Sequence, residues 1–177
     1  MKKVLLLMVA FVSLAVMGCS DSDDNTLVSG IIGYETFSAA KNAWKEPTSY
    51  SYTAILSSDA IGSYMIDVKV SNGKSECMPN AKQTSGGTME GVLAVFAWNV
   101  KTIAGLFESI EQENIYVKTD PTLQANYKCC FIEPSYDTYG DKRFLSVVSC
   151  WGIPKRSGLM GGYGMGITIT DFKILEE

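Results

Sequence analysis

The sequence predicts an α+β fold in which two helices pack on a mostly antiparallel sheet of about seven strands. Two segments repeat apolar residues at the spacing of a helix, and several others alternate apolar and polar residues as half-buried strands do. Turn residues connect most of the expected strands directly. Such short connections favour antiparallel neighbours, because parallel strands need a long crossover.

The helices are bounded by clear start and stop residues. The first is expected over residues 34–44, and Pro47 prevents it from continuing. The second is expected over residues 102–113, where Thr102 is a suitable N-cap before an apolar stripe. Residues 89–99 fit either a buried strand or the start of a helix, because their apolar run has no decisive period.

The clearest hairpin signal is Asn72-Gly73 between two alternating segments, since both residues tolerate positive φ. Another turn is expected within residues 134–141, and a glycine-rich connection over 158–166. A strand, not a helix, is expected after that connection, which argues against a phosphate-binding loop. The strands are expected at residues 49–57, 64–70, 74–78, 115–118, 127–133, 143–151 and 167–175.

The N-terminus has the features of a secretion signal. Lys2 and Lys3 precede an apolar run over residues 4–16, which is too short to span a bilayer comfortably. The run ends in Val16-Met17-Gly18-Cys19, which resembles the lipobox of bacterial lipoproteins. We therefore expect residues 1–18 to be removed and Cys19 to begin the mature chain as its lipid-carrying residue.

The residues after Cys19 fit an exported lipoprotein. The run 20–25 is polar and acidic, so residues 19–33 are expected to form a flexible tether before a single domain over residues 34–177. Ser20, rather than Asp, disfavours retention in the inner membrane. We expect an outer-membrane lipoprotein that faces the periplasm or the cell surface, held to the membrane by its N-terminal lipid anchor.

Composition excludes several classes of function. The mature chain has 13 basic and 19 acidic residues and no basic cluster along its sequence, so we expect no nucleic-acid partner. The chain contains no His, which excludes Ser-His-Asp catalysis and His-ligated zinc. We expect no cofactor and no catalytic residues.

Four cysteines remain after Cys19, and an oxidising envelope favours disulfides. If the last long hairpin turns around Tyr139-Gly140, Cys150 lies opposite Cys129 and one position from Cys130. We therefore expect a disulfide from Cys150 to Cys129 or Cys130, with the other thiol near Cys77 or buried. Four reduced core thiols remain the alternative.

Three further groups admit both a site and a structural interpretation. Asp137 and Asp141 offer oxygen ligands to Ca²⁺, but a hairpin turn uses the same residues, and we favour the turn. Acidic residues at 108, 111 and 113 fit a solvated helix face better than a glycosidase pair. Aromatic residues could line a ligand groove, although sheet core is the favoured interpretation; these are Tyr50, Tyr52, Tyr64, Trp98 and Trp151.

Four motifs in this order resemble a family of bacterial lipoprotein domains of unknown function. They are Trp44 with Ser49-Tyr50-Ser51-Tyr52, the hairpin Val68–Lys74, the helix Thr102–Ile110 and the turn Tyr136–Gly140. The resemblance covers about residues 35–175. Where family members often have Pro after the last Gly, this chain has Asp141-Lys142-Arg143, and it lacks their Cys pair near the first strands. The resemblance implies architecture and export, and no activity.

The leading functional hypothesis is a non-enzymatic, lipid-anchored envelope protein that binds a protein, peptide or small ligand with one face of its sheet. The alternatives are an envelope hydrolase without His and a structural accessory subunit of a surface complex. A hollow with convergent polar groups would favour ligand binding, and a flat apolar patch a protein partner. A Ser or Asp paired with a buried Lys or acid would favour the hydrolase.

Overall fold

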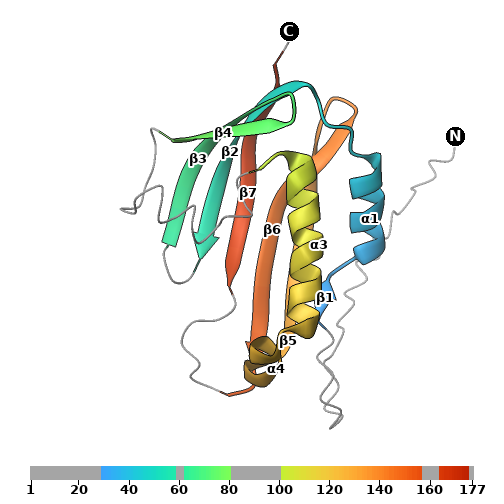
Figure 1. Cartoon of the computed structure of the whole chain (residues 1–177), viewed down its shortest axis with the longest axis vertical. Coiled ribbons are helices and arrows are strands. Elements are labelled where there is room, and N and C mark those ends of the chain that lie inside the picture. The colour runs from blue at the N-terminus through green and yellow to red at the C-terminus, as the bar shows by residue number, and fades with distance from the viewer. Residues whose placement is uncertain (1–28, 59–61, 81–100, 157–163, 176–177) are drawn as a thin grey trace, which may run out of the picture.

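One seven-stranded sheet organises the chain, with the strand order β1-β5-β6-β7-β2-β3-β4 (Figure 1). The structure is a computed structural model that describes residues 29–58, 62–80, 101–156 and 164–175. All neighbouring strands are antiparallel except β1 and β5, which are parallel. The predicted α+β class is therefore confirmed. The strands are β1 (Gly30–Ile31), β2 (Ser49–Ser58), β3 (Gly62–Ser71), β4 (Lys74–Pro79), β5 (Tyr127–Tyr139), β6 (Lys142–Pro154) and β7 (Met165–Ile174), and the helices are α1 (Tyr34–Ala43), α3 (Ile103–Thr119) and α4 (Pro121–Asn126).

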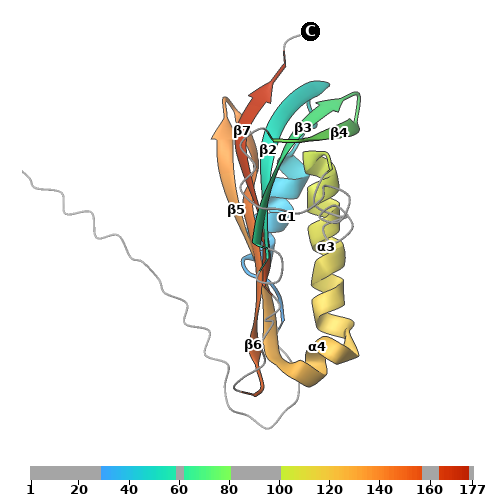
Figure 2. The same ribbon diagram turned by 90° about the vertical axis from the view of Figure 1, so that its left-hand side faces the viewer.

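The helices of the described residues lie on one face of the sheet (Figure 2). The core fills the space between these two layers, and α1 and α3 each bury one face in it. Tyr50, Tyr52 and Tyr64 belong to this core, as expected for aromatic residues at alternating strand positions. The largest fully buried side chains are Tyr50, Phe37, Phe107, Leu56, Ile66, Ile103, Leu106, Ile110, Ile132, Leu145 and Ile167.

The predicted Asn72-Gly73 hairpin is confirmed. Asn72 and Gly73 have φ of 50° and 73°, and Ser71 pairs with Lys74 across a two-residue turn. Positive φ at both central positions is the requirement of a type I′ turn, whose twist matches that of the flanking strands. Residues 81–100 lie outside the described residues, so the prediction for residues 89–99 and for Trp98 stays a prediction.

The predicted helix 102–113 and strand 115–118 form one continuous helix, α3. Thr102 is its N-cap, as expected, and its Oγ1 accepts a hydrogen bond from the Gly105 amide at 3.0 Å. The β-branched and aromatic residues at 115–118 suggested a strand, but Asn114 and Val117 continue the buried stripe. The predicted strand is therefore wrong, because tertiary burial overrides local propensity.

Strands β5 and β6 pair in a register that differs from the prediction. The turn occupies Gly140-Asp141, and a β-bulge between Ser135 and Tyr136 shifts the pairing further. Strand β5 therefore continues to Tyr139, through most of the predicted 134–141 turn. Cys150 lies opposite Ile132, so the predicted Cys129–Cys150 register is wrong.

The four described cysteines are thiols in the structure. Cys129 pairs with Ile153 and Cys130 with Gly152, so neither faces Cys150 directly. Among the described cysteines, Cys77, Cys129, Cys130 and Cys150, none is in a disulfide. Burial raises the pKa of the Cys130 thiol to about 11, with a smaller contribution from the charge of Glu113.

The folded part of the chain begins earlier than residue 34. Ser29 is buried and its Oγ accepts a hydrogen bond from the Cys130 amide at 3.0 Å. Ile31 donates its amide hydrogen to Asn114 Oδ1 on α3 at 3.0 Å. The segment 29–33, which we assigned to the tether, therefore joins the edge of the sheet and packs under α3.

Candidate functional site

The face of the sheet opposite the helices is the strongest candidate for a binding surface. Successive strand residues point to opposite faces, so residues next to the core positions Leu56, Ile132 and Cys150 point away from the helices. We call this side the open face. Its described residues include Ile55, Ser57, Met65, Asp67, Phe131, Glu133, Val147, Ser149, Trp151 and Thr168.

A hollow of about 360 Å³ lies at the open face where β6, β7, β2 and β3 meet. Across these strands Ser149, Gly166, Ser57 and Ser63 lie side by side in one row, and Glu133 extends the row onto β5. The lining consists of Ser57, Ser58, Gly62, Ser63, Ser149, Gly164, Met165 and Gly166. Serines of three strands line this open hollow, so it offers hydrogen-bonding groups to a polar ligand.

Gly166 leaves the middle of this row without a side chain. A Cβ at this position would lie 3.1 Å from the Val148 carbonyl oxygen and 3.2 Å from Ser57 Oγ. Those distances are closer than ordinary van der Waals contact, so a side chain would push against the sheet and fill the hollow. Gly166 is the last residue of the glycine-rich stretch predicted as a connection, and it already belongs to β7.

An aromatic pair stands beside the row of serines. The rings of Phe131 and Trp151 pack across β5 and β6 with centroids 4.6 Å apart. Trp151 lies two residues after Ser149 on the same strand, so both side chains point to the open face. Trp151 is 39% exposed, so its predicted place in the core is wrong. The indole offers a flat apolar surface and an N–H donor two residues along β6 from Ser149, which lines the hollow.

Farther along β3, the Asp67 carboxylate links neighbouring segments of the open face by hydrogen bonds. Asp67 Oδ1 accepts hydrogen bonds from Thr53 Oγ1 at 2.8 Å and from Asn80 Nδ2 at 2.6 Å. These bonds join β2, β3 and the residue after β4. Sequence analysis did not identify this cluster, because its three members belong to separate segments of the chain.

The helical side contains a second polar network, around Glu46. Its Oε1 accepts a hydrogen bond from Tyr50, and its Oε2 accepts from Trp44 Nε1 at 2.5 Å and from the Ala104 amide at 2.9 Å. Tyr50 Oη in turn accepts from the Ile103 amide at 2.7 Å. These bonds satisfy the first amides of α3 and place a carboxylate at the positive end of its dipole. We interpret the network as a helix cap.

Burial governs the ionisation of the tyrosines in this region. Desolvation, followed by the hydrogen bond to Glu46, raises the pKa of Tyr50 well above its ordinary value. Desolvation also raises the pKa of Tyr52, whose hydroxyl donates to the Lys101 carbonyl oxygen. Both side chains are therefore neutral hydrogen-bonding groups at physiological pH.

The contact between Ser109 and Lys101 belongs to the start of α3. Lys101 Nζ lies 3.2 Å from Ser109 Oγ, while Ser109 donates to the Gly105 carbonyl oxygen at 2.9 Å. Lys101 is exposed to solvent, and the Ser109 hydroxyl is bonded to the backbone of its own helix. The arrangement therefore gives no support to the hydrolase alternative.

The acidic candidates are dispersed. Asp137 Oδ1 accepts a hydrogen bond from the Thr138 amide at 2.7 Å, while Asp141 lies in the exposed hairpin turn. Glu111 is half-buried and pairs with Lys41 of α1 at 2.5 Å, so it is part of the α1–α3 contact and not only of a solvated face. Within residues 29–58, 62–80, 101–156 and 164–175, no group of three or more Cys, Asp or Glu is placed to hold a metal ion.

Comparison with known proteins provides no function by similarity. A scan against protein-family models and a search of curated proteins found no match to the chain. The resemblance to bacterial lipoprotein domains therefore stays a hypothesis. In the described part of the chain, no helix has the length and apolarity needed to cross a bilayer.

Proposed function

We propose that this chain is a non-enzymatic, lipid-anchored protein of the bacterial outer membrane that binds a ligand on the open face of its sheet. The lipobox ending in Cys19 supports the anchor. The observation that carries the binding function is the exposed Trp151 beside a hollow lined by serines. An aromatic surface next to convergent hydroxyl groups is typical of a site for a ligand that has both an apolar side and hydrogen-bonding groups.

The character of the face favours a ligand over a large structural partner. A permanent subunit contact needs an extended apolar surface. Here the apolar side chains of Ile55, Met65 and Val147 are half-buried, and the row of serines with Gly166 separates them from Trp151. A peptide segment or a small polar molecule fits such a surface better than a flat protein face does.

Labelling and crosslinking test the two parts separately. A fatty-acid analogue should be incorporated into the wild-type chain and not into Cys19→Ala; equal incorporation would refute the anchor. A photoreactive phenylalanine analogue introduced at Ser57 should crosslink an envelope ligand, and the same analogue at Tyr34 of α1 on the helical side should not.

Replacing two exposed aromatic residues, one at a time, provides a test and a matched control for the crosslinking experiment. Trp151→Ala should reduce crosslinking from position 57, whereas Tyr139→Ala removes an aromatic ring that is 42% exposed on the β5–β6 hairpin and should leave it unchanged. Equal crosslinking in the Trp151→Ala chain, or equal yields from positions 57 and 34, would contradict binding at the open face.

A further inference from the structure

The direction in which the chain enters the fold identifies one end of the molecule as the end nearest the anchor. Strand β1 runs parallel to β5, with Gly30 beside Phe131 and Ile31 beside Ile132. Strand β1 therefore begins at the end of the sheet where β5 begins, which is the end where α4 lies (Figure 1). A chain spans at most about 3.6 Å per residue, so Cys19 lies within about 36 Å of Ser29.

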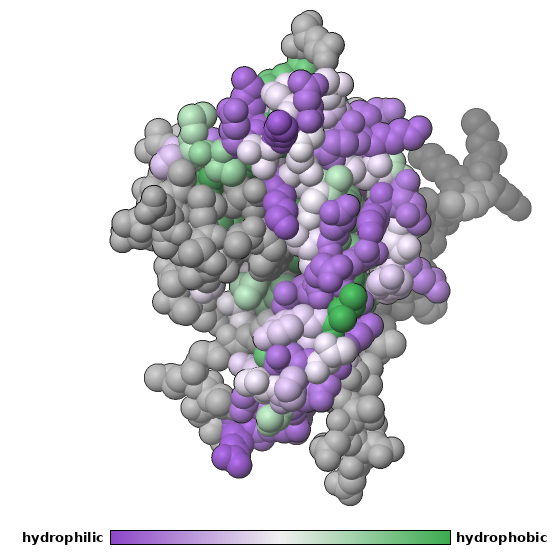
Figure 3. All heavy atoms as spheres, in the orientation of Figure 1, coloured by the Kyte–Doolittle hydropathy of each residue, from purple (hydrophilic) through white to green (hydrophobic). Residues whose placement is uncertain are grey.

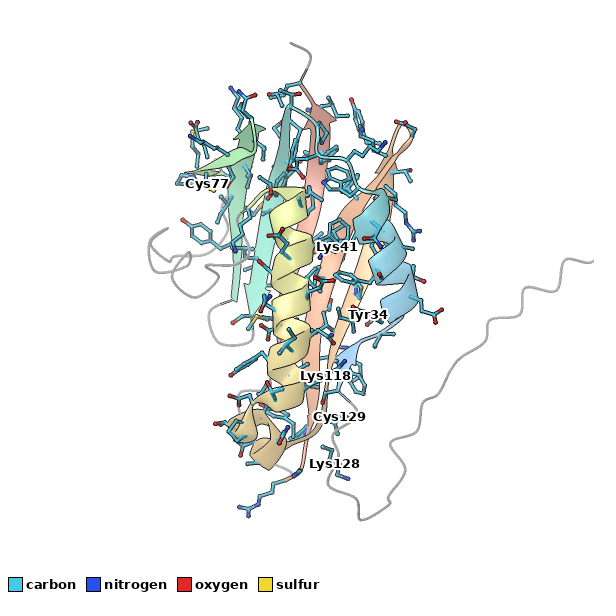
Figure 4. The ribbon with its side chains drawn as sticks, turned by 45° about the vertical axis from the view of Figure 1, so that its right-hand side comes forward. Tyr34, Lys41, Cys77, Lys118, Lys128 and Cys129 are labelled. Carbon is cyan, nitrogen blue, oxygen red and sulfur yellow. The ribbon has the colours of Figure 1, made fainter. Side chains whose placement is uncertain are left out.

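Basic residues gather at this end. We define the tether end as residues 115–130 and 153–156, which comprise the end of α3, α4, the start of β5 and the end of β6. Lys118 of α3 and Lys128 of β5 both belong to this end of the molecule (Figure 4). The Lys155 amide donates to the Asn126 carbonyl oxygen at 2.9 Å, which brings Lys155 and Arg156 beside α4. All four basic side chains are exposed.

The charge of the tether end is opposite to that of the rest of the protein. It contains four of the 13 basic residues of the mature chain and one of the 19 acidic residues, Asp120. Asp120 Oδ1 caps α4 by accepting from the Leu123 amide at 2.8 Å. Glu113 is the next acid on α3, one turn farther from the end, and is half-buried. A protein with strong overall negative charge thus presents a positive end where its tether begins.

Lys118 also fixes the entry point of the chain. A Cβ on Gly30 would lie 2.7 Å from Lys118 Cε and 2.7 Å from Asn114 Oδ1, so Lys118 packs directly over the backbone of β1. Gly30 has φ of 144°, which side chains rarely tolerate. Two exposed apolar side chains of α3, Ile115 and Tyr116, lie within three residues of Lys118. Lysine with a neighbouring aromatic residue is typical of proteins that rest on a lipid surface.

We propose that the tether end docks on anionic phospholipid headgroups, so that Lys118, Lys128, Lys155 and Arg156 orient the domain on the membrane. This inference rests on the proposed lipid anchor, which holds the basic end within reach of the headgroups. In this orientation the sheet stands upright on the bilayer, and the open face is directed sideways. The helical face seen in Figure 3 is mostly hydrophilic in its described part, as expected for a surface that stays in water.

Vesicle binding of the unacylated mature chain tests the basic end without the anchor. Residues 19–177 with Cys19→Ser should bind vesicles that contain phosphatidylglycerol more tightly than vesicles of phosphatidylcholine alone, and added salt should weaken the binding. Each basic residue near an anionic surface contributes about a fivefold increase in binding. Lys128→Gln with Lys155→Gln should therefore weaken binding about 25-fold.

The hairpin at the other end of the sheet provides the control. Lys69→Gln with Lys74→Gln removes the same charge from two exposed positions of β3 and β4 and should leave vesicle binding unchanged. Equal effects of the two double variants, or equal binding to both vesicle types, would overturn the proposal. Fatty-acid labelling of Cys19 is independent of this measurement, so failure of the anchor and failure of the basic end are distinguishable.

Amine footprinting of the acylated protein tests the orientation itself. In vesicles containing phosphatidylglycerol, Lys128 and Lys155 should react more slowly with an acetylating reagent than in phosphatidylcholine vesicles, while Lys69 and Lys74 should not change. Slow reaction of Lys128 before vesicles are added would instead indicate that the acidic tether covers the basic end, and would overturn the proposal.

Discussion

Removing one hydroxyl from the cap of α3 should measurably destabilise the protein. Tyr50→Phe keeps the ring, which packs against Phe172 with centroids 5.3 Å apart. It removes the acceptor of the Ile103 amide and the donor to Glu46. Ile103 is fully buried, so water cannot replace the lost acceptor.

The magnitude follows from the groups left without partners. An unsatisfied buried amide costs about 1–3 kcal/mol, and loss of a hydrogen bond to a carboxylate contributes a similar amount. The mutant no longer has to desolvate the tyrosine hydroxyl on folding, which offsets part of this cost. We expect a net loss of about 2 kcal/mol in the free energy of unfolding, which corresponds to a decrease in Tm of about 4–8 °C for a chain of this length.

Urea denaturation followed by near-ultraviolet circular dichroism measures the change. Tyr34→Phe is the matched control, because Tyr34 is 48% exposed at the start of α1, and it should change the free energy of unfolding by less than about 0.5 kcal/mol. If Tyr50→Phe also stays within that limit, the interpretation of the Glu46 network as a cap is wrong.

Three further outcomes are expected. Burial and the hydrogen bond to Glu46 raise the pKa of Tyr50, and burial raises the pKa of Tyr52. The free energy of unfolding should therefore be fully retained below about pH 10 and should fall above it by about 1.4 kcal/mol per pH unit for each tyrosine. Tyr50→Phe should reduce this slope by about 1.4 kcal/mol per pH unit, and an unchanged slope would count against the assignment. Cys130, with a pKa of about 11, should react with iodoacetamide at pH 8 about 100-fold more slowly than an ordinary thiol until urea unfolds the chain, and rapid native labelling would contradict its burial. Gly30→Ala should release β1 at a cost of about 1–3 kcal/mol, seen as faster hydrogen exchange of the Ile31 amide, whereas retained protection would show that Asn114 and Lys118 can move aside.

Local signals were reliable where the physical cause is local. Asn72-Gly73 requires only backbone tolerance of positive φ, and Thr102 requires only a side-chain oxygen within reach of a helix amide. Both predictions are confirmed. Pro47 similarly predicted the end of the first helix, and α1 ends at Ala43, one residue before the expected limit.

Predictions failed where pairing across the sheet decided the result. The expected Cys129–Cys150 contact depended on the position of one turn, and a single β-bulge near Ser135 changed every pair beyond it. Trp151 has the alternating neighbours of a core residue, yet it belongs to the face of β6 that the helices do not cover. Neither the bulge nor the covered face is encoded by a short motif.

The sequence by itself determined the α+β class, the main hairpin, the helix starts and the expectation of a lipid anchor, because periodicity, turn chemistry and the lipobox are local patterns. Only the tertiary structure assembled the row of serines beside Trp151 and the basic tether end. Their members come from separate strands and helices, and Lys118 and Lys155 show no cluster along the chain. They meet because the register of the sheet and the packing of α3 over β1 place distant residues side by side, and those contacts depend on the whole core.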